Sequence, residues 1–175
     1  AYGKTTDLTA MGGAQYVHTF DKCFFMPSDL TAGLEYNRDR LKDNMWGYDR
    51  HTDQTVNIYS AFLQNEWKND RWGILIGGRL DKHNLIDHII FSPRANLRFN
   101  PTQNINLRLS YSSGFRAPQA FDEDMHIENV GGTVAMIERA KNLKEEKSQS
   151  FSASADMYHR FGVFQTNFLI EGFYT

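Results

Sequence analysis

The chain has 175 residues, of which 14% are aromatic, and its 19 basic and 21 acidic side chains leave a formal net charge of −2. This balance excludes the strongly basic surface of a nucleic-acid-binding domain. The mean hydropathy of −0.55 and the lack of a long apolar run exclude a transmembrane helix. A membrane β-barrel stays compatible, because only every second residue of its strands is apolar.

The N-terminal part of the chain predicts two strands followed by a loop. Met11 to Phe25 is rich in aromatic and β-branched residues but alternates poorly, and Met26 to Asp29 has turn-forming residues. Leu30 to Asn37 alternates between apolar and polar side chains, which predicts a strand with one apolar face. Arg38 to Gln54 is polar and charged, and we expect a loop there.

The next two predicted strands are Thr55 to Trp67 and Trp72 to Asp81, joined by a tight turn at Lys68 to Asp70. In the first of them Phe62 falls among the polar positions. The glycines of the second suit a curved strand with bulges. Lys82 to Asp87 predicts a short loop.

Ser92 to Pro118 holds the clearest pattern, in which two alternating stretches flank the turn sequence Asn100 to Asn104. Ala95, Leu97 and Phe99 alternate with arginine and asparagine before the turn, and a similar alternation follows it. We therefore predict a β-hairpin with one apolar face and one face rich in arginine and asparagine.

Ser113 to Lys147 shows no sustained period, and loops of this length are usually functional or disordered. Ser150 to Met157 and Phe164 to Tyr174 alternate again around a turn at His159 to Gly162. The sequence thus predicts an all-β fold with eight up-and-down strands. Each strand is about the ~10 residues that cross a bilayer at a tilt.

The predicted connections alternate between short and longer ones, so all tight turns fall at one end of the sheet. Outer-membrane barrels have this asymmetry, with short periplasmic turns and longer extracellular loops. Aromatic residues lie mostly near strand ends, as two interfacial girdles would place them, although strand propensity and core packing also favour aromatics in strands. These residues are Tyr16, Phe20, Phe24, Phe25, Tyr36, Tyr59, Trp67, Trp72, Phe99, Tyr111, Tyr158, Phe161 and Phe164.

The sequence resembles the barrel of a TonB-dependent outer-membrane receptor. The resemblance rests on SPRANLRF at 92–99 and on NLRLSYSSGFRAPQAFDE at 106–123, where a strand leads through GFRAP into a large loop. AFLQNEWK at 61–68 and GILIGGRLDKH at 73–83 are also similar to strands of that family. The resemblance covers most of the chain from about Leu30 onward.

The resemblance implies a barrel of about 22 strands around a plugged lumen, so that residues 1–175 are part of one transmembrane β-barrel domain in the bacterial outer membrane. No plug domain, TonB-box segment or terminal strand ending in an aromatic residue is found, and we therefore expect a segment of a larger protein. The implied function is active uptake of a scarce solute, with ferric siderophore favoured over cobalamin, haem or oligosaccharide. The implied partners are the TonB energy-coupling complex, outer-membrane lipid and lipopolysaccharide, and a small-molecule ligand.

The long loop supplies the candidate ligand-binding residues, which are Arg116, Asp122, Glu123, Asp124, His126 and Glu128. Its acids and histidine suit a metal chelate or a cationic ligand, or else form a solvated charge run. Arg116 either pairs with a carboxylate that fixes the loop or plug, or faces the ligand. Arg139 to Lys147 is either a solvated rim or a basic patch that contacts lipopolysaccharide or an anionic ligand.

Four arginines fall on the polar faces of predicted strands, namely Arg79, Arg94, Arg98 and Arg108. In a barrel they would line the lumen and meet acidic groups of a plug, whereas in a soluble protein they would be solvated. The six histidines lack metal-ligand spacing, and no nucleophile elbow or phosphate loop occurs. The sequence therefore predicts no enzyme, cofactor or metal site.

Two other architectures stay open at this point. A complete eight-stranded outer-membrane barrel, acting as adhesin or anchor, requires pairing between its first and last strands. A soluble β-barrel or sandwich that binds a lipophile requires that the apolar faces are buried and the arginine faces are wet.

Overall fold

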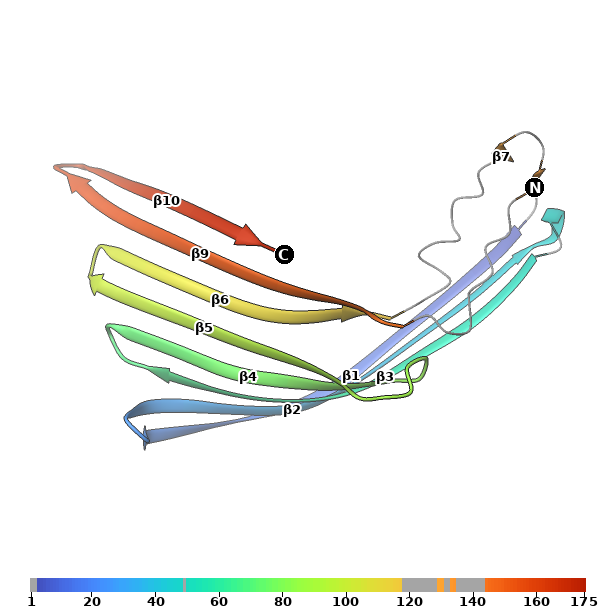
Figure 1. Ribbon diagram of the computed structural model, residues 1–175, viewed down its shortest axis with the longest axis horizontal. Coiled ribbons are helices and arrows are strands. Elements are labelled where there is room, and N and C mark those ends of the chain that lie inside the picture. The colour runs from blue at the N-terminus through green and yellow to red at the C-terminus, as the bar shows by residue number, and fades with distance from the viewer. Residues whose placement is uncertain (1–2, 49, 118–128, 131–132, 135–143) are drawn as a thin grey trace.

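A computed structural model describes residues 3–48, 50–117, 129–130, 133–134 and 144–175 of the chain. Eight strands form one strongly curved antiparallel sheet in the order β1-β2-β3-β4-β5-β6-β9-β10, as Figure 1 shows. The elements are β1 (Gly3–Cys23), β2 (Met26–Met45), the 3-10 helix η1 (Trp46–Tyr48), β3 (Arg50–Lys68), β4 (Trp72–His83), β5 (Ile90–Thr102), β6 (Ile105–Arg116), β7 (Asn129–Val130), β8 (Thr133–Val134), β9 (Glu146–Phe161) and β10 (Phe164–Tyr174).

The predicted up-and-down arrangement of eight strands is confirmed. Each strand of the sheet pairs with the next one along the chain, and only the two-residue strands β7 and β8 form a separate hairpin between β6 and β9. The tight turns β1–β2, β3–β4, β5–β6 and β9–β10 lie together at one end of the sheet, and the other connections lie at the opposite end (Figure 1). We call these the turn end and the far end.

The strand register assigns every residue to one of two faces, because residues directly opposite each other in a ladder point to the same side. Glu35 pairs with Ser60, and Ser60 pairs with Asp81, on what we call the polar face. Leu34, Ala61 and Leu80 are likewise joined on the opposite, apolar face.

The central hairpin follows the predicted alternation. Leu97 pairs with Leu109, and Ala95 pairs with Tyr111, on the apolar face. Arg98 pairs with Arg108 on the polar face. The prediction of one apolar face and one face rich in arginine and asparagine is therefore confirmed.

The apolar face is not packed against a second layer within the described chain. Leu34, Leu63 and Ile76 are 67%, 55% and 56% exposed, and the only cluster of buried apolar residues among the described ones joins Ile86, Ile90 and Ala117 near the far end. The soluble sandwich, which needs a buried apolar face, is therefore the wrong architecture. No helix in the described part of the chain is long and apolar enough to cross a membrane.

The two outer strands β1 and β10 are the edges of the sheet and do not pair with each other. A complete eight-stranded barrel would need that pairing. The sheet therefore has the geometry of a barrel wall that is open at both edges.

Aromatic side chains form two rows on the apolar face. At the turn end, Trp72 stacks on Phe99 with a ring-centroid distance of 4.2 Å. Nearer the far end, Tyr36 lies 4.9 Å from Tyr59, measured between ring centroids. Along β3, Trp67 of the first row and Tyr59 of the second are about 26 Å apart at about 3.3 Å per residue.

Further ring contacts extend both rows. Trp67 stacks on Phe25 at 5.8 Å, and Tyr111 lies 4.8 Å from Phe151. Tyr158, which was expected with these aromatics, is instead on the polar face, where its hydroxyl donates to Asp156 at 2.7 Å. The reason is register, because Tyr158 continues the row of β9 that holds the serines and Asp156.

The prediction of a loop at Arg38 to Gln54 is wrong. The strands β2 and β3 run on through this segment, and only residues 46–49, which include η1 (Trp46–Tyr48), lie between them. Both faces are polar here, so the alternation that signals a strand is lost. The strands are held instead by backbone pairing and by cross-strand contacts such as Arg40 to Asp53 at 3.3 Å.

Smaller boundary errors have local causes. The first turn is at Phe24–Phe25 rather than at Met26 to Asp29, with Phe24 at a φ of 63°. Pro27 sits inside β2, where its missing N–H is tolerated because the ladder to β3 begins at Ser28. In the last hairpin the strand continues to Phe161 and the turn begins at Gly162, which adopts a φ of 59°.

Two glycines of the polar face are required by close neighbours. A Cβ at Gly33 would lie 2.3 Å from the ring of Phe62, which explains how this phenylalanine fits among polar residues. A Cβ at Gly77 would lie 2.6 Å from Gln64 Cβ and 2.9 Å from the backbone oxygen of Leu63. The second site can relax less, because strand backbone cannot move aside as the ring of Phe62 can.

We expect Gly77→Ala to destabilise the sheet by about 1–3 kcal/mol, the usual cost of an overpacked site. Gly12→Ala is the matched control, because no atom lies within 4 Å of its Cβ position. The urea midpoints of the purified variants measure the difference. Equal midpoints for the two variants would contradict the close packing at Gly77.

Candidate functional site

All five arginines named from the sequence share the polar face. The register joins Arg94 to Ser112 and Arg98 to Arg108, and it places Arg79 opposite Ser92. Arg116 lies on the same face at the end of β6, opposite Glu146. Their common face follows from the ladders, whereas its assignment to a lumen stays a prediction.

Arg79 is held by residues of the sheet itself. Its guanidinium contacts Glu35 at 2.5 Å and Asp81 at 2.8 Å, and it donates to the Ser60 hydroxyl at 2.8 Å. Ser60 in turn donates to Asp81 at 2.6 Å, and the Asp81 side chain is only 4% exposed. The charge of Arg79 is thus balanced within the sheet by Asp81 of its own strand β4 and by Glu35 of β2.

Three of the other four arginines, those within β5 and the middle of β6, are held less firmly. The Arg98 guanidinium donates to the backbone oxygen of Asn69 at 3.1 Å, and Arg108 donates to Asn106 at 2.9 Å. Arg94 has no hydrogen-bonding side-chain partner among the described residues. Arg94 is therefore the arginine of this face that is best placed to contact a group from outside the sheet.

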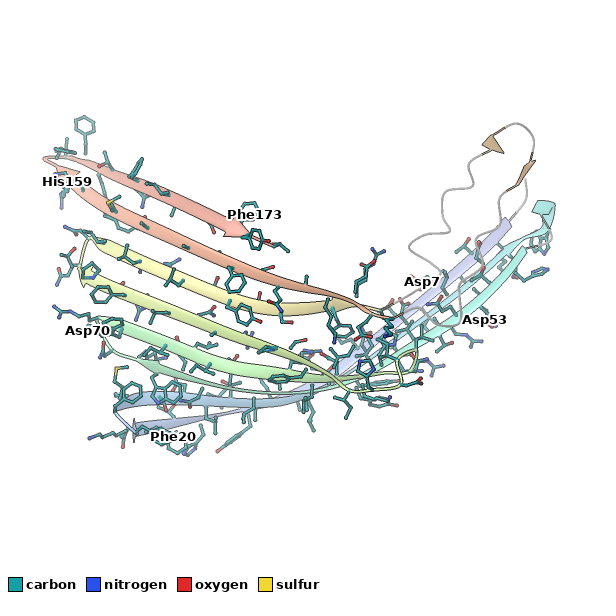
Figure 2. The ribbon with its side chains drawn as sticks, viewed as in Figure 1. Asp7, Phe20, Asp53, Asp70, His159 and Phe173 are labelled. Atoms are coloured by element: carbon teal, nitrogen blue, oxygen red, sulfur yellow. The ribbon has the colours of Figure 1, made fainter. Side chains whose placement is uncertain are left out.

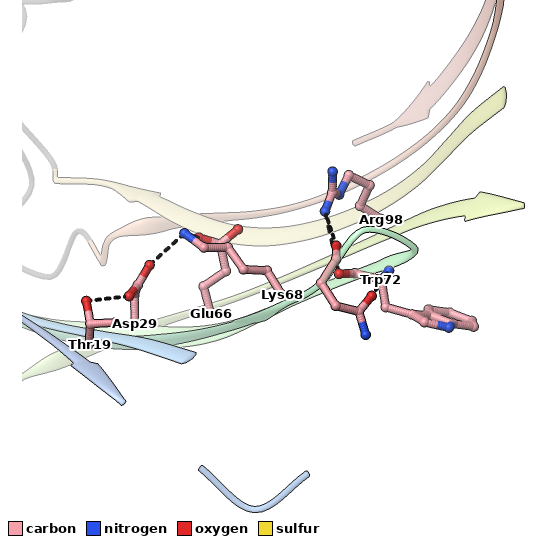
Figure 3. Close-up of polar contacts among 7 residues, drawn as sticks. Thr19, Asp29, Glu66, Lys68, Trp72 and Arg98 are labelled. Atoms are coloured by element: carbon pink, nitrogen blue, oxygen red, sulfur yellow. Dashed lines mark hydrogen bonds and ion pairs between the residues drawn. The ribbon is translucent and has the colours of Figure 1, made fainter. Parts of the chain in front are cut away.

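At the turn end, an ion pair joins strands β2 and β3 on the polar face. Lys68 lies 2.6 Å from Asp29, which also accepts a hydrogen bond from Thr19 at 2.8 Å (Figure 3). Glu66 is 4.0 Å from the same ammonium group. Figure 3 also draws Arg98, whose Nη2 atom lies 3.5 Å from the backbone oxygen of Trp72.

At the far end, the polar face of β1 and β2 carries a row of acids. Thr5 donates to Asp43 at 2.7 Å and Thr9 donates to Asp39 at 3.3 Å. Burial raises the pKa of Asp39 above its ordinary value, and a hydrogen bond with the carboxyl group of Asp7 adds to the rise. Figure 2 shows Asp7 and Asp53 near one end of the sheet, and Asp70 and His159 near the other.

Arg116 lies at the base of the long loop, with its Nη1 atom 4.0 Å from Glu146 Oε2 on the neighbouring strand. The remaining loop candidates Asp122, Glu123, Asp124, His126 and Glu128 lie outside the described residues. The ligand-binding role of these candidates therefore stays a prediction. Searched over its described residues, the chain holds no cluster of His, Cys, Asp or Glu that is suited to a metal ion.

The sequence analysis missed Glu35 and the acids of the far end. A signal was present, because every second residue from Asp29 to Asp43 lies on the polar face of β2. It was overlooked because the segment after Asn37 was taken for a loop. The contact between Glu35 on β2 and Arg79 on β4 has no signal in the sequence, because it depends on how the strands are paired.

The sequence matches the family profile described as "TonB dependent receptor-like, beta-barrel" over residues 2–175. The chain belongs to this TonB-dependent receptor family. A comparison with curated proteins finds no match.

Solved TonB-dependent receptors show the same fold at low sequence identity. The siderophore receptor PirA from Pseudomonas aeruginosa is 17% identical with a TM-score of 0.68, and the match covers 95% of this chain and 31% of that receptor. A mutant ferric enterobactin receptor PfeA from the same organism is 19% identical with a TM-score of 0.66, and the match covers 90% of this chain and 25% of that receptor. The siderophore receptor PirA from Acinetobacter baumannii is 16% identical with a TM-score of 0.60, and the match covers 95% of this chain and 26% of that receptor.

The chain spans about a quarter to a third of the length of these receptors. Its eight strands therefore correspond to part of a TonB-dependent receptor barrel.

We expect Arg79→Met to destabilise this barrel segment by about 1–2 kcal/mol, because it leaves the buried carboxylate of Asp81 with an unpaired charge. Arg94→Met removes the same charge and the same bulk from a site with no side-chain partner among the described residues, and should change stability by less than about 0.5 kcal/mol. Urea titration of both variants provides the comparison. Similar losses for both would show that the contacts of Arg79 add nothing to stability.

We expect stability to depend on the protonation of Asp39. Folding raises its pKa, so the native state binds this proton more tightly than the unfolded chain does. The native state therefore loses stability as the pH rises from the unfolded pKa, ordinarily near 4, through the folded one. Asp39→Asn should raise the unfolding temperature at pH 7 and have little effect below pH 4.

The control for this titration is Asp53→Asn. Hydrogen bonds from Arg40 and then Lys42 hold the pKa of Asp53 below its ordinary value. Its replacement should leave the unfolding temperature unchanged or lower at pH 7. A rise for both variants at pH 7 would point to a general charge effect instead of the carboxyl pair.

Proposed function

We propose that this chain is part of the barrel of an outer-membrane receptor that takes up a scarce solute with energy supplied through TonB. The family match over residues 2–175 is the observation that carries the proposal. Ferric siderophore is the solute class that we favour, because solved receptors of the same fold are described as siderophore and ferric enterobactin receptors. Cobalamin, haem and oligosaccharide are the other classes to be tested.

Residues 1–175 form part of one barrel domain, in which the apolar face meets lipid and the polar face meets the lumen. The exposed leucines and isoleucines of the apolar face support this orientation. The two aromatic rows support it as well. Their separation of about 26 Å along β3 becomes roughly 20 Å along the membrane normal at a tilt of about 40°, close to the apolar band of about 25 Å in such barrels.

In this orientation the arginines of the polar face line the lumen. Arg94 is then the side chain that contacts an acidic group of a plug domain, since Arg79 is already balanced by Glu35 and Asp81. The far end is extracellular, and the loop that follows Arg116 contacts the solute. Asp122, Glu123, Asp124, His126 and Glu128 provide oxygen and nitrogen donors for that contact.

The uptake experiment uses a strain that lacks the gene of the parent receptor. We expect the deletion to slow growth under iron limitation and to abolish uptake of one radiolabelled ferric siderophore from a panel. A second deletion, in the TonB system, should have the same effect on that siderophore. Uptake of cobalamin, haem or an oligosaccharide in place of all siderophores would reject the favoured class but keep the receptor.

The loop residues are tested by replacing all five with alanine in the full receptor. We expect the affinity for the transported solute to fall about tenfold or more, equivalent to about 1.4 kcal/mol. Asp21→Ala with Asp70→Ala is the control, because both acids lie at the turn end. Unchanged affinity in the loop variant would assign solute contact to other parts of the receptor.

A further inference from the structure

The loop between β4 and β5, residues 84–89, is fastened to the far end of the sheet by hydrogen bonds (Figure 1). The Asn84 backbone N–H donates to the oxygen of Asn57 at 3.1 Å, and its side-chain oxygen accepts from the Asn57 N–H at 2.9 Å. Its side-chain amide also donates to the backbone oxygen of Thr55 at 2.8 Å. The Lys82 ammonium group donates to two backbone oxygens of the loop, at 2.8 and 2.7 Å.

The same loop contacts both described ends of the connection between β6 and β9. Ile86 forms a buried apolar cluster with Ile90 and with Ala117, the residue that follows β6. His88 Nε2 lies 3.0 Å from the carboxylate of Glu145, the residue that precedes β9. The position of the loop 84–89 and the path of the chain at the base of the longer connection therefore depend on each other.

His83, the last residue of β4, supports this loop from the polar face. Its exposed fraction is 0%, and its Nδ1 atom accepts a hydrogen bond from the Leu85 backbone N–H at 3.0 Å. Because Nδ1 is an acceptor, the neutral ring has its proton on Nε2. The Nε2 atom is buried and has no hydrogen-bonding partner among the described residues. The one hydrogen bond of this ring therefore requires its neutral form.

The groups around His83 offer no free acceptor for a second ring proton. On β4, Asp81 lies two positions earlier on the same face, but its Oδ1 atom already accepts hydrogen bonds from Ser60 and Arg79. On β3, the residue opposite His83 is the apolar Ile58. Other ionisable side chains of the neighbouring elements are paired elsewhere, namely Glu35 with Arg79, Asp39 with Asp7, Arg116 with Glu146, and His88 with Glu145, while Asp87 is exposed.

We propose that His83 is a pH-sensitive latch, which holds the loop 84–89 on the sheet when the ring is neutral and releases it when the ring is protonated. Protonation places a hydrogen on Nδ1, so two donors then face each other where the Leu85 N–H was bound. It also creates a charge at a fully buried position, which desolvation disfavours. Release of the ring detaches the loop, and Ile86 leaves its cluster with Ala117.

The direction of the pH dependence follows from burial. His83 lies one position beyond the level of Tyr59, and in the released loop its pKa is the ordinary one, near 6.5. Burial lowers the pKa of His83 in the closed loop, although the charge of Asp81 acts in the opposite direction. The latch is therefore fully stable above about pH 6.5. Each pH unit below that value weakens it by up to about tenfold, until the buried ring is itself protonated.

His88 belongs to the same loop and has the opposite effect. Its side chain is 57% exposed and contacts Glu145, so protonation strengthens that contact. Acidification therefore tightens the loop through His88 and releases it through His83. The two histidines can be separated by experiment.

The test measures hydrogen exchange in the full receptor, purified in detergent and without solute, at pH 7 and pH 5. After correction for the intrinsic exchange rates, the protection of a peptide covering residues 84–90 should fall about tenfold on acidification. A peptide covering residues 72–79, in the middle of β4, should keep its protection. Equal protection of residues 84–90 at the two pH values would overturn the latch.

Two variants assign the effect to one ring. His83→Asn keeps an oxygen acceptor near the place of Nδ1 and cannot be protonated, so its loop should stay protected at both pH values. His88→Asn is the matched control from the same loop, and its protection should still fall about tenfold. The proposal is wrong if His83→Asn loses protection on acidification as the unmodified receptor does, or if His88→Asn abolishes the loss.

Folding of each variant is followed by the change in electrophoretic mobility that a folded barrel shows on heating. The ¹⁵N signals of the His83 ring in the unmodified receptor provide a measurement that needs no folded variant. At pH 7 only Nε2 should be protonated, and a proton on Nδ1 would overturn the latch. Because exchange is measured without solute, a receptor that transports no siderophore would reject the favoured solute and leave this result unchanged.

Discussion

The continuous ladder of backbone hydrogen bonds is the constraint on which this structure depends. Each strand pairs with its sequence neighbour from β1 to β6, and then through β9 to β10, so the register of one pair fixes the faces of the next. A slip of a single residue would exchange the two faces of a strand. The arginines and acids of the polar face stay separated from the aromatic rows because the register of β1–β2 and of β5–β6 shifts only next to their tight turns, at Phe20/Cys23 and Phe99/Thr102.

The polar face is assembled from contacts that cross strands. Glu35, Arg79 and Asp81 come from β2 and β4, and Ser60 of β3 lies between them. Such a cluster holds three strands together and leaves Arg94 on β5 as a donor that is not used within the sheet. Arg79 therefore stabilises the sheet, whereas Arg94 is available to bind a group from outside the sheet.

Much of this fold could be predicted from the sequence, because alternation is strongest where one face is apolar. The hairpin around Asn100 to Asn104 and the grouping of tight turns at one end both follow from that pattern. The continuation of β2 and β3 past Asn37 could not be predicted, since both faces are polar there. The partners of Arg79 were missed for another reason, because contacts between distant strands depend on register, which no single strand encodes.

The extension of β2 and β3 beyond the tyrosine pair ends in a connection of only four residues, 46–49, which includes η1 (Trp46–Tyr48). Its two strands are paired up to Met45 and Arg50, so the height of this rim is set by strand length. Because neighbouring positions point to opposite sides, an insertion of one residue would turn Arg40 or Asp39 to the wrong side. Lengthening both strands at the tip would leave these faces unchanged, and each residue added to both strands would raise the rim by about 3.3 Å along the strand.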